Sequence, residues 1–226
     1  MKKDIVIFDL DGTLLDTLAD LASSVNYALR RHGLPERPTH EIRHFLGNGI
    51  RSLMRCAVPE GTDERLSETV FQTFREHYVQ HCMDRTCPYP GIMETLAGLK
   101  HRGVRMAIVS NKLQPAVSEL SAHFFHDFIA IAVGESETVR RKPHPDAVIR
   151  AMYDLGGSPQ QTLYVGDSEV DIETARRAAV PCVSVTWGFR DEDYLRSLSP
   201  DVLIHRPEEL LDCLELPLTN EAGRAK

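Results

Sequence analysis

Residues 4–17, DIVIFDLDGTLLDT, place two carboxylates directly after a short apolar run. The run, residues 5–8, has the apolar and β-branched character of a buried parallel strand. Asp9 and Asp11 follow it, separated by one residue, and the pattern then becomes helical. Two like charges held close together in a low dielectric raise each other's pKa and reduce stability. The stretch therefore predicts a further group that offsets this repulsion.

Apolar runs and helical patterns alternate over most of the chain. This alternation predicts βαβ units, and so an α/β fold with a doubly wound, mainly parallel, Rossmann-like sheet. Strands are expected at residues 5–8, 104–109, 128–133, 162–165, 182–185 and 202–204. Helices are expected at residues 91–102, 114–123, 146–155, 169–179 and 207–214.

One interval breaks this alternation. Residues 15–88 contain no strand-like run, and helical patterns occupy residues 18–32, 39–45, 50–58 and 63–83. We predict that residues 15–88 form an inserted all-helical domain, and that residues 1–14 and 89–215 form a discontinuous α/β core domain. Residues 216–226 are expected to be a flexible tail.

The composition restricts the partners. The 226 residues carry a net charge of −7 with no basic block, which argues against nucleic acid or an anionic membrane. No apolar run approaches the roughly 20 residues of a membrane span, and the N-terminal run is too short for a signal peptide. Five cysteines without a CxxC pair indicate reduced thiols and a cytoplasmic location. The sequence is compatible with either a monomer or a homodimer.

Polar residues follow several of the predicted strands. In open α/β sheets, ligands bind beyond the carboxyl ends of the strands. The residues at such positions, with a lysine in the loop RRKPHPD, are Asp9, Asp11, Ser110, Asn111, Lys142, Asp167 and Asp171. We expect them to converge at one edge of the sheet.

The charges in this set suggest a metal site. Four aspartates against the single Lys142 leave a negative cluster that a divalent cation would bring close to neutrality. Carboxylate oxygens without histidine or cysteine suit Mg²⁺, which also bridges to substrate phosphate. The predicted metal residues are Asp9, Asp11, Asp167 and Asp171.

Four segments in order resemble the motifs of the haloacid dehalogenase superfamily. They are DLDGTLLDT, Ser110-Asn111, Lys142-Pro143 and GDSEVD. Each segment alone is a weak signal, whereas four in order are strong. The helical insert between the first and second segments resembles the type-one cap of that superfamily.

The resemblance implies a phosphatase with a covalent intermediate. Asp9 would attack phosphorus to form an aspartyl phosphate, and Asp11 would act as general acid and then as general base. Ser110 and Asn111 would hold phosphoryl oxygens, and Lys142 would neutralise the charge of the transferring group.

The resemblance also implies how the metal is held. Asp9, the backbone carbonyl of Asp11 and Asp167 would hold Mg²⁺, with Asp171 acting directly or through water. Gly12 would give the backbone the freedom to turn past the phosphate.

The insert offers a candidate for substrate recognition. The segments DTLADL at residues 16–21 and FLGNGIRSL at residues 45–53 resemble phosphoglycolate phosphatases, which makes phosphoglycolate the leading substrate. Gly47, Asn48, Gly49 and Arg51 would then contact the substrate. The alternative is that this loop is only a glycine turn between two helices.

Other activities of the superfamily are less consistent with the sequence. Asp11 argues against dehalogenation, and Leu21 stands where β-phosphoglucomutases have a histidine. Residues 15–88 contain no lysine for the Schiff base of phosphonoacetaldehyde hydrolases. A pyrophosphatase, a sugar-phosphate phosphatase or mutase, and a non-catalytic binding protein remain as alternatives.

Two further groups of residues are expected to have structural rather than functional roles. His77, His81 and Cys82 could suggest zinc, but they lack a general-base glutamate in an HExxH arrangement, and they lie on a helix expected to be exposed. Trp187 follows a predicted strand and is expected to pack at the edge of the site.

Overall fold

The computed structural model describes residues 3–215, so the tail predicted at residues 216–226 lies outside the described part. The chain divides into two compact units. One joins the residues up to Leu14 to the chain from Pro88 onward, and the other is Leu15–Cys87. They are called here the sheet unit and the helical unit.

The sheet unit is built on six strands in the order β5-β4-β1-β6-β7-β8. The strands are β1 (Ile5–Phe8), β4 (Arg105–Leu113), β5 (Ile131–Glu135), β6 (Thr162–Gly166), β7 (Cys182–Val185) and β8 (Val202–Ile204). All five neighbouring pairs are parallel, as the apolar runs predicted. On one side of β1 the chain runs through β4 to β5, and on the other through β6 to β8. The strand order therefore reverses at β1, which is where such sheets bind ligands.

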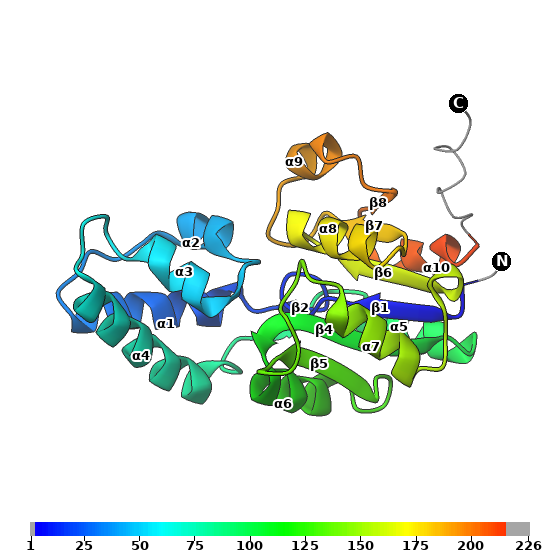
Figure 1. Cartoon of the computed structure of the whole chain (residues 1–226), viewed down its shortest axis with the longest axis horizontal. Helices are drawn as coiled ribbons and strands as arrows, with labels where there is room; N and C mark the ends of the chain where they lie inside the picture. Colours follow the sequence, from blue (N-terminus) through cyan, green and yellow to red (C-terminus); the bar gives the residue numbers. More distant parts are fainter. Residues whose placement is uncertain (1–2, 216–226) are drawn as a thin grey trace. The chain divides into compact units, whose positions relative to one another are not determined.

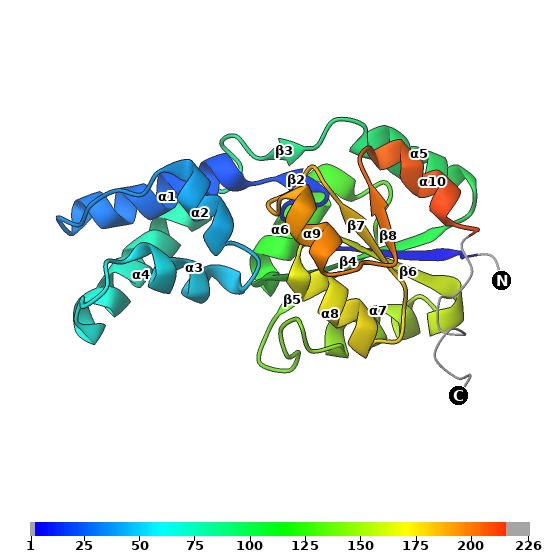
Figure 2. The ribbon, with the colours of Figure 1, turned by 90° about the horizontal axis from the view of Figure 1, so that it is seen from above.

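Helices cover both faces of this sheet. In Figure 2, α5 (Ile92–His101) and α10 (Leu210–Cys213) lie on one face, and α7 (Asp146–Asp154) and α8 (Glu169–Arg177) lie on the other. A further helix, α6 (Gln114–Phe125), packs beside β4 and β5. The side chains between the sheet and α7 and α8 form a buried apolar cluster. The predicted doubly wound α/β fold is confirmed.

The helical unit contains four helices. They are α1 (Leu18–Arg31), α2 (Thr39–Phe45), α3 (Gly49–Ala57) and α4 (Glu64–His81), drawn in blue to teal in Figure 1. α1 packs on α4, and Leu29, Ile42 and Phe74 are fully buried. Two strands of two residues each, β2 (Leu15–Asp16) and β3 (Cys87–Pro88), pair with one another. The sequence analysis missed them, because so short a strand shows no periodicity.

Three further elements differ from the predictions. β4 continues to Leu113, beyond the expected end at residue 109. β5 begins at Ile131 rather than at residue 128, because the backbone N–H of Phe128 and of Ile129 turns back to the carbonyl of Phe125. A 3₁₀ turn, Pro207–Glu209, precedes α10, where one continuous helix was predicted.

Two short elements were not predicted at all. They are a 3₁₀ turn, Pro159–Gln161, and α9 (Glu192–Ser197). Within residues 3–215, no helix has the length and apolar composition needed to cross a membrane.

Candidate active site

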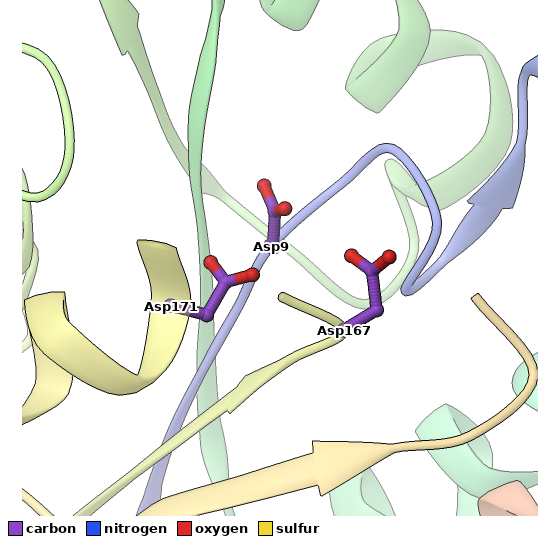
Figure 3. A group of neighbouring side chains, drawn as sticks. All are labelled: Asp9, Asp167 and Asp171. Carbon is purple, nitrogen blue, oxygen red and sulfur yellow. The ribbon is translucent and has the colours of Figure 1, made fainter. Parts of the chain in front are cut away.

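Three aspartates meet at the carboxyl end of the sheet. Asp9 follows β1, Asp167 follows β6 and Asp171 lies in the first turn of α8. Each offers a carboxylate oxygen, and these oxygens lie within 4.8 Å of one another. Figure 3 shows the three side chains directed toward a common space. The structure therefore brings together three of the four aspartates predicted to bind metal.

Lys142 is buried against this cluster. Its Nζ lies 2.8 Å from Oδ1 of Asp9 and 2.7 Å from Oδ1 of Asp171, and it donates to the hydroxyl of Tyr164 at 3.0 Å. Burial by itself would lower the pKa of Lys142, but the carboxylates of Asp171 and Asp9 outweigh it and raise that pKa. The lysine is therefore a fixed cation beside the end of β1.

Both oxygens of Asp171 are already occupied by hydrogen bonds. Oδ1 accepts from Lys142 and from the Tyr164 hydroxyl, at 2.7 and 3.0 Å. Oδ2 accepts from the backbone N–H and the hydroxyl of Ser168, at 3.1 and 2.6 Å, which completes a capping box on α8. This arrangement suits a residue that positions Lys142 and the start of the helix.

Asp9 and Asp167 resist ionisation in the metal-free protein. Burial raises the pKa of Asp9 to about 7, with Asp171 and Asp11 adding to the shift and Lys142 opposing it. Burial also raises the pKa of Asp167 well above its ordinary value, although the backbone N–H of Phe189 donates to its Oδ2 at 2.7 Å. A bound cation would oppose both shifts, because a nearby positive charge favours the ionised carboxylates.

The donors around Asp167 fit a small, hard divalent cation. They are carboxylate oxygens, and the backbone approaches them closely. A Cβ at Gly12 would lie 2.6 Å from Oδ2 of Asp167, and one at Gly188 would lie 2.4 Å from the Cβ of Asp167. Gly12 also has a φ of 84°, which only glycine adopts readily. The tight turn at Gly12 therefore has a structural reason besides the one that the motif implied.

Three consecutive polar residues lie at an irregularity in β4. Val109 pairs with Val133 but Leu113 pairs with Glu135, so β4 carries a bulge between them. Ser110, Asn111 and Lys112 lie within this irregularity, and all three are buried. The amide of Asn111 donates to the carbonyl of Lys142 at 3.1 Å, which ties β4 to the lysine loop.

Lys112 and Tyr164 are site residues that the sequence analysis missed. The Nζ of Lys112 lies 2.7 Å from Oδ1 of Asp11. Lys112 could have been found from its position directly after Ser110-Asn111, because four carboxylates outnumber the one predicted lysine. Tyr164 sits within an apolar strand and offers no such signal.

Trp187 supports the turn that follows β1. Its indole N–H donates to the carbonyl of Thr13 at 3.0 Å, and the hydroxyl of Thr13 donates to Asp167 at 3.4 Å. The segment after β7 thus holds the turn at Gly12 and Thr13 in place.

In the helical unit, the Gly-Asn-Gly segment forms the start of α3. Gly47 and Gly49 have φ values of 105° and 76°, and Asn48 occupies the N-cap position. Arg51, in the first turn, pairs with Glu68 at 2.6 Å and lies over the ring of Phe71 at 4.1 Å. The predicted substrate residues of this unit thus have clear local structural roles.

The histidines of α4 are held by neighbours in the same unit. The rings of His77 and His81 stack with centroids 4.2 Å apart. His77 contacts the hydroxyl of Ser24 at 3.0 Å, and His81 pairs with Asp84 at 2.8 Å. These contacts are those of a packed helix surface.

Comparison with known proteins agrees with the site geometry. The family profile of haloacid dehalogenase-like hydrolases matches residues 6–185. The chain belongs to this family. It is 34% identical over 221 residues to the phosphoglycolate phosphatase of Pseudomonas putida, covering 95% of this chain and 81% of that protein. It is 31% identical to the N-acetylmuramic acid 6-phosphate phosphatase of Pseudomonas aeruginosa, covering 96% of this chain and 97% of that protein.

Solved structures lead to the same family. The crystal structure of a protein from Lactobacillus delbrueckii subsp. bulgaricus superposes on this chain with a TM-score of 0.90. The two sequences are 33% identical, and the superposition covers 95% of this chain and 99% of that chain. The chain is thus a haloacid dehalogenase-like phosphatase similar to phosphoglycolate phosphatases.

The raised pKa values give a pH-dependent prediction for metal binding. Because the folded-state pKa of Asp9, about 7, exceeds its unfolded value, its contribution to stability is present at low pH and is lost as pH rises through that pKa. A cation must displace this proton at low pH but not at high pH. We expect Mg²⁺ to raise the Tm clearly more at about pH 8 than at about pH 5.

Thermal unfolding with and without Mg²⁺ at both pH values measures this difference. Asp167→Ala should lose most of the Mg²⁺-induced shift at both. An equal shift of the wild-type Tm at the two pH values would contradict the electrostatic argument.

Proposed function

We propose that the protein is a Mg²⁺-dependent phosphomonoester hydrolase that works through an aspartyl phosphate. The supporting observation is the environment of Asp9. Its Oδ1 is held by Lys142 at 2.8 Å, and the structure shows Asp167 beside it at the edge of the sheet. Oδ2 of Asp9 is then the oxygen directed to attack phosphorus.

The residues of the sheet unit supply the other steps. An oxygen of Asp9 forms a bond to phosphorus while the bond to the leaving oxygen breaks, and Asp11 donates a proton to that oxygen. A water molecule then attacks the aspartyl phosphate, Asp9 recovers its electron pair and Asp11 takes the proton of the water. Ser110 and Asn111 hold the phosphoryl oxygens, and the ammonium of Lys142 balances their charge.

The proposed metal residues are Asp9, Asp167 and the backbone carbonyl of Asp11. When bound there, Mg²⁺ supplies charge neutralisation for the phosphoryl group. Asp171 acts in this scheme by holding Lys142 rather than by a direct bond to the ion, since each of its oxygens accepts two hydrogen bonds, whereas each oxygen of Asp167 accepts one.

Phosphoglycolate is the leading substrate. The similarity to phosphoglycolate phosphatases and the GNGIR segment support it. A sugar phosphate is the second candidate, because a relative of similar coverage is an N-acetylmuramic acid 6-phosphate phosphatase. A panel of small phosphate esters, with pyrophosphate included, distinguishes these substrates by kcat/KM. Full activity after exhaustive chelation would overturn the metal-dependent mechanism.

Arg51 gives a test of the role proposed for the helical unit. We propose that this unit moves about residues 15–17 and 87–91, and that Gly47, Asn48, Gly49 and Arg51 approach the far end of the substrate. Arg51→Ala should then raise KM for phosphoglycolate and leave hydrolysis of a bulky aryl phosphate nearly unchanged.

The ion pair of Arg51 supplies matched controls. Exposed ion pairs contribute only about 0–1 kcal/mol, so Arg51 can leave Glu68 at little cost. Glu68→Gln should therefore keep or lower the KM for phosphoglycolate, and Arg55→Ala, one turn along α3, should not change it. Equal loss of activity toward both substrates in Arg51→Ala would make Arg51 a structural residue only.

A further inference from the structure

A second buried lysine lies at the site and is held against Asp11. The Nζ of Lys112 donates to Oδ1 of Asp11 at 2.7 Å. The side chain of Lys112 is 4% exposed and that of Asp11 is 21% exposed. An ammonium buried to this extent is costly unless it is paired. The pair with Asp11 therefore accounts for a cation that the scheme above does not use.

The local backbone brings Lys112 to this position. Lys112 is buried and lies in the irregular part of β4, between Val109 and Leu113. The hydroxyl of Ser110 accepts from the backbone N–H of Lys112 at 3.2 Å, which fixes the main chain at that point. The backbone of Lys112 is thus fixed on β4, the strand beside β1, and Asp11 follows β1.

We propose that Lys112 is a positioning residue that aims the carboxyl group of Asp11 at the leaving oxygen and at the attacking water. This inference rests on the proposed function. The contact engages Oδ1 and leaves Oδ2 for proton transfer. Without it, the side chain of Asp11 is free to rotate, and a misplaced acid or base transfers protons poorly. Lys112 acts through Asp11 and does not touch the phosphoryl group.

The two half-reactions need Asp11 to different extents. With 4-nitrophenyl phosphate, the oxygen of Asp9 bonds to phosphorus and nitrophenolate leaves as a stable anion, so no proton is required. With phosphoglycolate, the leaving oxygen must take a proton from Asp11. In the second half-reaction water attacks phosphorus, the bond to Asp9 breaks and Asp11 accepts the proton, whatever the substrate was.

Lys112→Met should therefore separate kcat from kcat/KM. With 4-nitrophenyl phosphate and Mg²⁺, kcat should fall by ~10-fold or more while kcat/KM stays within about twofold, because only the second half-reaction is slowed. The phosphoenzyme should accumulate and be visible by mass spectrometry of the quenched protein. With phosphoglycolate, kcat/KM should fall as well. Lys112→Arg, which keeps the charge, should recover part of the loss.

Two further measurements make the test decisive. In an Asp11→Asn background, Lys112→Met should cause no additional loss, because the two residues act as a unit. Lys112→Gln, which keeps a hydrogen-bond donor, is compared in case the methionine variant does not fold. Equal loss of kcat and kcat/KM with 4-nitrophenyl phosphate, additive losses in the double variant, or unchanged kinetics would each overturn the proposal. A wild-type enzyme that forms no phosphoenzyme would instead overturn the proposed function.

Discussion

Replacing Asp9 by asparagine is expected to lower turnover by at least ~10³-fold. The substitution keeps the shape of the side chain and removes the attacking charge. Lys142 still has Asp171 at 2.7 Å, so it is not left without a partner. Because burial opposes ionisation of Asp9, the neutral asparagine should leave the metal-free protein as stable as the wild type or slightly more stable.

Steady-state kinetics and thermal unfolding together test this prediction. No phosphoenzyme should be trapped from the Asp9→Asn variant, and its Tm without metal should not fall. The matched control is Asp154→Asn, an exposed position on α7 whose carboxylate lies 3.6 Å from Arg150. Near-normal turnover in a purified, sequence-verified Asp9→Asn protein would remove Asp9 from the nucleophile position.

Removing Lys142 should affect both activity and stability. Lys142→Met deletes the cation that contacts Asp9 and Asp171 and leaves two buried carboxylates without their shared partner. Breaking a buried pair in this way typically costs ~3–5 kcal/mol. Activity should fall by at least ~10²-fold, because the phosphoryl group loses a preorganised positive charge.

A double variant separates these two effects. Adding Asp171→Asn to Lys142→Met removes one of the stranded charges and should recover much of the lost free energy of unfolding, while activity stays low. Denaturant unfolding and kcat/KM provide the two readouts. The exposed Lys100→Met is the control for loss of a lysine charge. If the double variant regains activity with its stability, Lys142 contributes only to folding.

Two of the candidate motifs could be located from sequence because each follows a strand that is buried on both faces. Such strands appear as continuous apolar runs, so the ends of β1 and β6 are visible, and polar residues beyond those ends are conspicuous. Asp9 and Asp167 were found in this way, and the structure places their carboxylates together. The excess of four aspartates over one lysine also predicted a bound divalent cation.

The partners of these residues could not be found in the same way. Tyr164 lies inside an apolar strand, and its contact with Asp171 arises only when α8 packs beside β6. The bulge in β4 depends on its register with β5, a pairing between distant residues that leaves no local pattern. The predicted end of β4 at residue 109 was therefore wrong.

The six strands of the main sheet, the helical pattern of residues 15–88 and the carboxylates at the sheet edge could be predicted from the sequence, because periodicity and strand ends are local properties. Which lysine forms an ion pair with which aspartate depends on the tertiary structure. Lys142 is shared between Asp9 and Asp171, whereas Lys112 belongs to Asp11. Lys112 and Asp11 lie 101 positions apart and Lys142 and Asp171 lie 29 apart, and the energies of these pairs depend on burial, which exists only in the folded chain.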